Sequence, residues 1–452
     1  MSDTRDHILA SAYACDPRLG SEAGIGWHLA RELAKFADVT LITRRNNVAA
    51  VEAAARVEGL ALTCVGHDLS PRLLRWKRGA RGAMPYYYLW QRSLGALASG
   101  LRPERPFTLA QHLTFASGWI PSGLATLDLP FVLGPIGQHP RVPDRFLPKA
   151  ALRARLAEPL KALVRRALPA LDPAYARTLA RADVILSLGG EFERSLPAQH
   201  AHKLAPLLAA GVDADAFPST SEGRRAPAGA LHVLFAGRLV ALKGPDLALA
   251  AFEALQRVAP SSTLTFVGAG PREGALRARV AAAGLADAVQ FRGSLSHDAA
   301  LTAMRAADVF LFPSFEGGGM VVPEAMAAGV PVVTLAHGGP GEMVSGARDG
   351  VSTGPRGIVV ASEGAPAAVV ERLSAALLTL ASNEALRRAM GRAARAFALD
   401  TAAWSAKGPA LAAACALAKE RHARRTRSRA QAAPALRGVA ALQGSERERS
   451  AA

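Results

Sequence analysis

The chain has 452 residues, half of them hydrophobic, and its 54 Lys and Arg against 37 Asp and Glu give a formal charge of +17. This composition excludes a disordered chain, and the length predicts two or three compact units of roughly 150 residues each. Three cysteines, Cys15, Cys64 and Cys415, exclude a disulfide framework and a cysteine-rich metal site. The polar first residues and the short apolar runs indicate neither a signal peptide nor a membrane span, so we expect a cytoplasmic protein.

Short apolar runs alternate with amphipathic stretches through the first half of the chain. This alternation is typical of a parallel α/β unit, which we assign to residues 1–217. Ligands of such sheets bind beyond the carboxyl ends of the strands, so the strand-to-helix turns are where chemistry is expected. The predicted elements are strands at 7–13, 39–43, 61–65, 108–112, 130–134 and 183–188, with a helix at 22–36.

Residues 218–230 are polar and carry two prolines, which is the composition of a linker. A second α/β domain follows over 231–395, so the fold class is α/β with two tandem Rossmann-like domains. A helix is predicted over 396–420 and a basic, disordered tail over 421–452. The elements predicted in the second domain are strands at 231–236, 263–267, 289–291, 309–312 and 330–334, and a helix at 245–258 that begins with proline.

Three segments account for the whole net charge. Residues 72–81 hold five basic and no acidic residues, 141–166 hold eight and two, and 419–452 hold nine and three. Half of the Tyr and Trp lie within 76–90, and aromatic rings beside cations are typical of contact with lipid headgroups. No zinc finger or similar nucleic-acid reader accompanies the charge. We therefore expect contact with an anionic membrane through 72–90 and 141–166, and no nucleic acid; a solvated basic helix beside a packed aromatic cluster is the alternative.

The turn after the strand at 231–236 carries two cations, Arg238 and Lys243, within Gly237–Gly244 and just before a helix N-terminus. Glycine lets the chain approach phosphates, and a helix N-terminus adds partial positive charge. Together the two cations can neutralise a diphosphate without a metal ion. Because basic residues in loops are usually only solvated, this turn alone is a moderate indication.

The strand at 309–312 ends in a glycine loop bounded by Glu316 and Glu324, with seven residues between them. Pro323 is predicted to begin the next helix, which places Glu324 in its first turn, where it can accept hydrogen bonds from a ribose diol. Glu316 directly precedes glycine amides that can hold sugar hydroxyls. The alternative is one glutamate that complements a helix dipole and another on a loop.

These motifs, with Phe266–Pro271 and Gly338–Glu342, resemble the retaining nucleotide-sugar glycosyltransferases of the GT-B fold, family 4 (glycosyltransferase group 1), over about residues 7 to 418. The resemblance implies two domains facing a central cleft. It places Arg238 and Lys243 on the donor diphosphate, Glu324 on the ribose and Glu316 beside the transferred sugar.

The same resemblance implies roles for backbone and for the first domain. His112, at a strand end, would contact the reacting sugar, although such a histidine is equally often structural. The loop reads Glu-Gly-Gly-Gly where Glu-Gly-Phe-Gly is commoner, so Gly318 removes an aromatic ring near the donor sugar. The predicted catalytic residues are Glu316, Arg238, Lys243 and His112, and the predicted donor-binding residues are Gly20, Gly237, Arg238, Lys243, Gly268, Gly293, Glu316, Gly317, Gly318, Gly319 and Glu324.

The expected function is transfer of a hexose from a nucleotide diphosphate donor to a glycan or lipid-linked acceptor in cell-envelope or exopolysaccharide synthesis, at the inner face of the cytoplasmic membrane. Asp213 and Asp215 match the Asp-x-Asp pattern of metal-dependent enzymes, but they offer too few ligands, so no metal and no cofactor are expected. A GT-B-like glycoside phosphorylase remains open. So do an NADP-linked oxidoreductase, for which Arg44 and Arg45 are compatible with a 2′-phosphate, and a non-catalytic basic scaffold that binds the envelope or nucleic acid.

Overall fold

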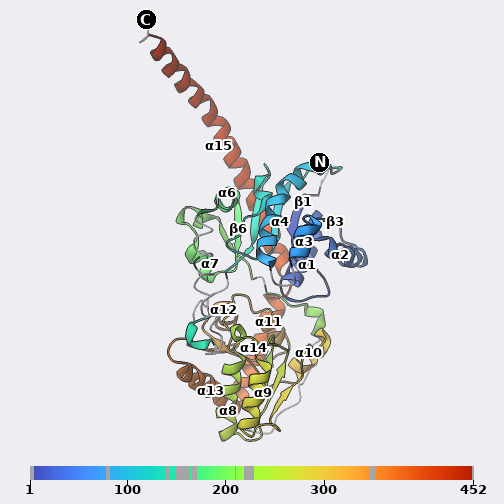
Figure 1. The fold of residues 1–452 in the computed structure, drawn as a ribbon, viewed down its shortest axis with the longest axis vertical. Helices are drawn as coiled ribbons and strands as arrows, with labels where there is room; N and C mark the ends of the chain where they lie inside the picture. Colours follow the sequence, from blue (N-terminus) through green and yellow to red (C-terminus); the bar gives the residue numbers. More distant parts are fainter. Residues whose placement is uncertain are drawn as a thin grey trace.

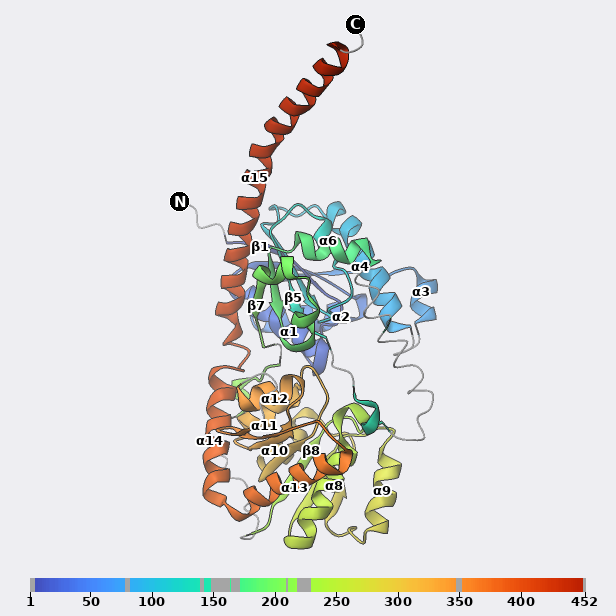
Figure 2. The same ribbon diagram turned by 90° about the vertical axis from the view of Figure 1, so that its left-hand side faces the viewer.

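The computed structural model describes residues 5–77, 82–138, 142–147, 163, 171–208, 210–217, 229–346 and 352–449. Two α/β domains lie one above the other, and the last helix runs along the side of the first domain and projects beyond it (Figures 1 and 2). In the described ranges no helix is both long and apolar enough to cross a bilayer.

The first domain is built on a seven-stranded parallel sheet in the order β3-β2-β1-β4-β5-β6-β7. The order reverses direction between β1 and β4, which is the point where open α/β sheets bind their ligands. The strands are β1 His7–Ala12, β2 Asp38–Thr43, β3 Leu62–Gly66, β4 Leu109–Thr114, β5 Phe131–Ile136, β6 Val184–Ser187 and β7 Leu204–Pro206.

Helices cover both faces of this sheet. One core packs α1 and the start of α15 against it, and the other packs the aromatic side of α4. Tyr86, Tyr87 and Trp90 are fully buried in that second core, so these three rings follow the alternative interpretation of a packed cluster and not a lipid contact. The helices are α1 Ser21–Ala34, α2 Arg45–Val57, α3 Pro71–Trp76, α4 Ala83–Gly100, α6 Pro173–Arg181 and α7 Gly190–Ser195.

The second domain repeats this topology with strands in the order β10-β9-β8-β11-β12-β14-β13, in which only β13 is antiparallel to its neighbour. Its strands are β8 His232–Ala236, β9 Thr263–Val267, β10 Val289–Phe291, β11 Val309–Phe312, β12 Val332–Leu335, β13 Ser352–Gly354 and β14 Gly357–Val360. Its helices are α8 Pro245–Val258, α9 Glu273–Ala282, α10 His297–Arg305, α11 Val321–Ala327, α12 Gly338–Ser345, α13 Pro366–Ser382 and α14 Glu384–Asp400.

The predicted fold class and strands are confirmed, with strand ends within two residues of those expected. The short strands β7, β13 and β14 were not predicted. The predicted linker falls mostly outside the described residues, as does most of the basic segment 141–166. The first domain ends earlier than predicted, since Val212 and Phe217 pack into the core of the second domain.

The C-terminal region crosses back to the first domain through α15 Lys407–Arg449. Trp404 stacks on His28 with ring centroids 4.5 Å apart, and Lys407 Nζ donates to the carbonyl oxygens of Leu208 at 2.6 Å and Ala210 at 3.0 Å. The predicted single helix over 396–420 is therefore the end of α14, a short connection and the start of α15.

The prediction of a disordered tail from residue 421 is wrong, since α15 continues to Arg449. Its residues are rich in Ala and Arg, which have a high helix propensity. The first of them also dock on the first domain. Arg421 donates to the carbonyl oxygens of Asp183 and His202, and Arg425 Nη1 donates to Asp183 Oδ1 at 2.6 Å.

Replacing Asp183 with alanine is expected to lower the free energy of unfolding by about 2 to 4 kcal/mol. The buried carboxylate accepts the Phe131 backbone N–H at 3.0 Å as well as Arg425, so its loss leaves both donors without their acceptor. Urea unfolding measures the change. Glu420→Ala, which removes only an exposed ion pair with Arg424, is the matched control and should stay within about 0.5 kcal/mol. An equal effect of the two variants would contradict this account of α15 docking.

Candidate active site

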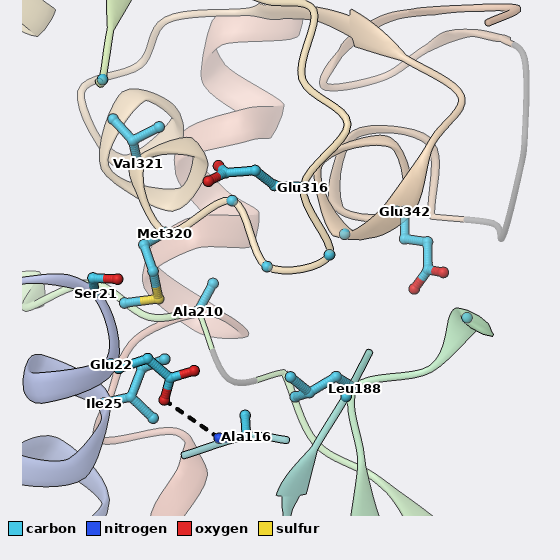
Figure 3. A pocket seen from close by; sticks show the side chains of 18 of the residues that line it. Ser21, Glu22, Ile25, Ala116, Leu188, Ala210, Glu316, Met320, Val321 and Glu342 are labelled. Carbon is cyan, nitrogen blue, oxygen red and sulfur yellow. Dashed lines mark hydrogen bonds between the residues drawn. The ribbon is translucent and has the colours of Figure 1, made fainter. Parts of the chain in front are cut away.

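A cavity of about 530 Å³ lies between the two domains. The carboxyl-end loops of both sheets form its walls, as expected for folds of this topology. Figure 3 shows Glu22 on one side of the space and Glu316 on the other. The first domain contributes Gly20, Ser21, Glu22, Ile25, Ala116, Gly137, Gln138, Leu188, Gly189, Gly190, Arg194 and Ala210, and the second contributes Gly237, Arg238, Lys243, His297, Glu316, Gly317, Gly318, Gly319, Met320, Val321, Glu324, His337, Gly338, Gly339 and Glu342.

The loop after β8 brings two cations to the cavity. Arg238 is exposed and forms no ion pair within the described part of the chain, whereas Lys243 Nζ lies 2.9 Å from Glu316 Oε2. A Cβ at Gly237, where φ is +146°, would lie 2.9 Å from the Lys243 stem. Glycine at 237 therefore lets the lysine cross the loop and reach Glu316.

The start of α12 packs against the backbone of the glycine loop after β11. The Gly339 N–H donates to the Gly317 carbonyl oxygen at 3.0 Å, and a Cβ at Gly338 would lie 2.2 Å from the Glu316 carbonyl oxygen. The Glu316 N–H donates to Ser314 Oγ at 3.0 Å. These contacts fix the backbone of the loop, so the Glu316 side chain has a defined position at the cavity wall.

Glu324 lies in the first turn of α11, as the sequence predicts, although the helix begins at Val321 and not at Pro323. Its Oε1 is 3.9 Å from His297 Nδ1 of α10, and burial raises the pKa of the Glu324 carboxyl while His297 opposes this. The two side chains meet at the cavity, so a ribose that binds there would contact a carboxyl and an imidazole.

The first turn of α1 forms the opposite wall. The Glu22 Oε2 accepts a hydrogen bond from the Ala116 N–H at 3.4 Å, as the dashed line in Figure 3 shows. Burial raises the pKa of the Glu22 carboxyl to about 7. A carboxyl with this pKa beside a cavity is typical of a group that works on a ligand.

Nine of the predicted residues line the cavity and three do not. His112 is paired in register with Ser11 inside the sheet, and its Nε2 lies 3.0 Å from the Phe115 carbonyl oxygen. Burial lowers its pKa to about 4. His112 does not line the cavity, because β4 continues to Thr114 and Ala116 is the lining residue that follows it, so contact of His112 with the sugar stays a prediction.

Gly268 and Gly293 also lie outside the residues that line the cavity. The Gly268 N–H donates to the Gly293 carbonyl oxygen at 2.7 Å, and a Cβ at Gly268 would lie 2.1 Å from the Gly237 carbonyl oxygen. Both glycines therefore support the cationic loop from the neighbouring strand ends in this structure.

Several lining residues were not predicted. His297 opens α10 after the turn at Gly293, and Glu342 lies in α12 within the glycine motif at 338–342. Both follow strands of the second domain, so the general rule that ligands bind at strand ends could have found them. Glu22, Gln138 and Arg194 belong to the first domain. Glu22 follows the predicted Gly20 in the same turn and Gln138 follows a strand end, so the strand-end rule indicates both of these regions.

The described residues include no group of three or more His, Cys, Asp or Glu that could hold a metal ion. Asp213 precedes a short 3₁₀ turn that contains Asp215, and neither residue lines the cavity.

Residues 219–397 match the family model described as glycosyl transferases group 1. This match lies over the second domain of the chain. It is 38% identical over 149 residues to a glycogen synthase of Mycobacterium tuberculosis, covering 33% of this chain and 36% of that protein. It is 32% identical over 226 residues to a GDP-mannose-dependent phosphatidylinositol monomannoside mannosyltransferase of Corynebacterium glutamicum, covering 46% of this chain and 55% of that protein.

These alignments span about a third to a half of the length of the curated relatives. Solved structures share the fold over most of this chain. The structure superposes on sucrose-phosphate synthase from Thermosynechococcus elongatus over 90% of this chain and 98% of that chain, with a TM-score of 0.61 and 18% identity. HepE of Anabaena, crystallised with UDP and glucose, matches over 90% of this chain and 98% of its own at a TM-score of 0.55 and 16% identity. The predicted GT-B fold is confirmed.

Proposed function

We propose that this chain transfers a sugar from a nucleoside diphosphate donor to a hydroxyl of a glycan or lipid-linked acceptor. The observation that carries the proposal is the meeting of Arg238, Lys243, Glu316 and Glu324 at one cavity between the domains. A scaffold that used charge alone would not need two cations and two spaced carboxyls at one point.

The chemistry follows from where charge develops. As the glycosidic bond of the donor breaks, negative charge grows on the leaving diphosphate, and fixed cations stabilise that charge without reorganising. Arg238 and Lys243 supply two positive charges, so the proposed reaction needs no metal ion and no cofactor. Retention of the anomeric configuration is proposed from the family resemblance.

Donor identity is the finer part of the proposal. Relatives and structural neighbours are described with GDP-mannose and with UDP and glucose, so UDP- and GDP-hexoses are the first donors to try. The test is a panel of UDP-, GDP- and ADP-hexoses scored by release of the nucleoside diphosphate. Release from at least one donor is expected. Turnover of NADPH, or of a glycoside with inorganic phosphate, in place of any nucleotide sugar would favour the alternative enzymes.

We propose further that α3 contacts the anionic inner face of the cytoplasmic membrane. Trp76 is 55% exposed, and Arg72 and Arg75 lie on the same short helix. Trp76→Ala is expected to reduce recovery with anionic vesicles in flotation by about threefold to tenfold, because an interfacial ring and neighbouring cations act together. Val57→Ala, at an exposed apolar position on α2, is the control. Equal recovery with neutral and anionic vesicles would contradict the proposal.

A further inference from the structure

Glu22 is a residue of the first domain that lines the cavity and belongs to none of the donor-binding motifs of the second domain. It is the second residue of α1 and lines the cavity beside Ile25 and Met320. In Figure 3 it lies across the space from Glu316, and so across from the loop expected to hold the transferred sugar. Among the described residues, its one hydrogen bond is to the Ala116 N–H at 3.4 Å, which occupies only Oε2.

The surroundings of Glu22 are apolar and neutral. Ile25 comes from α1, Ala116 from the loop after β4, and Met320 from the glycine loop. The Tyr87 hydroxyl of α4 is a titratable group near Glu22, and the Glu22 charge contributes to raising the pKa of Tyr87. Neither Ala116 nor Tyr87 is a cation that could stabilise the charged carboxylate of Glu22, and burial raises the pKa of this carboxyl.

A glutamate in a first helical turn often serves only the helix dipole, but that role favours the charged form and an exposed position. Burial prevails over the dipole at Glu22, because its pKa is raised and not lowered. Keeping such a carboxyl at a cavity costs stability, which a helix-capping role does not explain.

We propose that Glu22 binds the attacking hydroxyl of the acceptor. This inference rests on the proposed function and adds the acceptor side of the same site. The ligand is a neutral sugar or polyol hydroxyl, since a phosphate or carboxylate would be repelled by a carboxylate in an apolar wall. Oε1 accepts the hydrogen bond, and the hydroxyl is then held beside the donor sugar at the cavity wall that the first domain forms. Water takes the place of this hydroxyl when no acceptor is present.

The experiment needs no identified acceptor, because transfer to water uses the same position. Wild type, Glu22→Ala and Glu22→Gln are compared for nucleoside diphosphate release from a donor that wild type accepts, and for the Kd of UDP or GDP by calorimetry. We expect release to fall about 100-fold in Glu22→Ala and about 10-fold in Glu22→Gln, the size expected for a hydrogen bond to a charged group. The nucleotide Kd should stay within twofold. Glu58→Gln, which removes the same charge from a surface ion pair with Arg31, is the control.

The pH profile separates substrate contact from a structural role. The carboxylate is the better acceptor, and a raised pKa means that it forms only as the pH rises, so release by wild type should climb through about pH 7 and then level. In Glu22→Gln this limb should be absent. Release within twofold of wild type in both variants would overturn the inference, and so would a parallel loss of nucleotide affinity. If wild type releases nucleotide from no donor, the proposed function itself fails.

Discussion

Replacing Arg238 with alanine is expected to lower kcat/KM for nucleoside diphosphate release by about 10²- to 10³-fold, the usual effect of removing one preorganised donor from a developing charge. Arg238 is exposed at the cavity and forms no ion pair within the described residues, so its guanidinium is available to the proposed diphosphate. Lys243 can replace Arg238 only in part, because its ammonium is shared with Glu316 at 2.9 Å. Initial-rate kinetics with the donor found in the panel measure the loss.

Two further variants make the result specific. Arg238→Lys keeps the charge but loses the planar fork, and it should recover only about a tenth of the lost activity. Arg388→Ala removes an exposed arginine that pairs with Glu384 on α14, so it should leave kcat/KM unchanged. Arg238→Ala with a normal melting temperature and near-normal turnover would remove the main support for the proposed function.

The sequence predicts the fold well because both domains alternate strongly between apolar strands and amphipathic helices. Every strand of four or more residues except β14 was predicted to within two residues at each end. The cationic loop and the paired glutamates could also be predicted, since each motif lies at a strand end and its residues are close in sequence.

The differences between the sequence-based expectations and the structure have a common physical cause, which is that burial depends on partners far away in the chain. His112 ends a predicted strand, but two more strand residues keep it inside the sheet. Tyr86 and Trp90 follow a basic segment, yet they pack beneath it in the core. Glu22 becomes a site residue only because the second domain closes over it. A sequence pattern predicts which face of a helix or strand is apolar, but it does not predict which distant residues pack against that face.

Replacing Glu316 with glutamine is expected to separate donor binding from turnover. The ion pair between Glu316 and Lys243 holds the lysine away from a phosphate, and both side chains are mostly shielded from solvent. Its removal frees the lysine, so the Kd of UDP or GDP should stay constant or tighten by about twofold to tenfold. The family resemblance places Glu316 beside the transferred sugar, so kcat should fall about 100-fold. Calorimetry and initial rates with the same nucleotide measure the two effects.

Lys243→Met is expected to change the nucleotide Kd in the direction opposite to Glu316→Gln. Combined with that variant, it tests whether Lys243 and Glu316 act together. It removes a phosphate ligand and leaves the Glu316 carboxylate unpaired at the cavity wall, so nucleotide affinity should weaken by about 10- to 100-fold. In the double variant the repelling carboxylate is also gone, and affinity should recover by more than Glu316→Gln improves it in the wild-type background, so the two single effects on Kd do not add. If Glu316→Gln keeps full turnover, or if the two single effects on Kd add, Glu316 does not hold Lys243 in the way the 2.9 Å contact implies. If the ion pair does hold Lys243, a donor whose diphosphate binds Lys243 must either break this ion pair or share the lysine with Glu316.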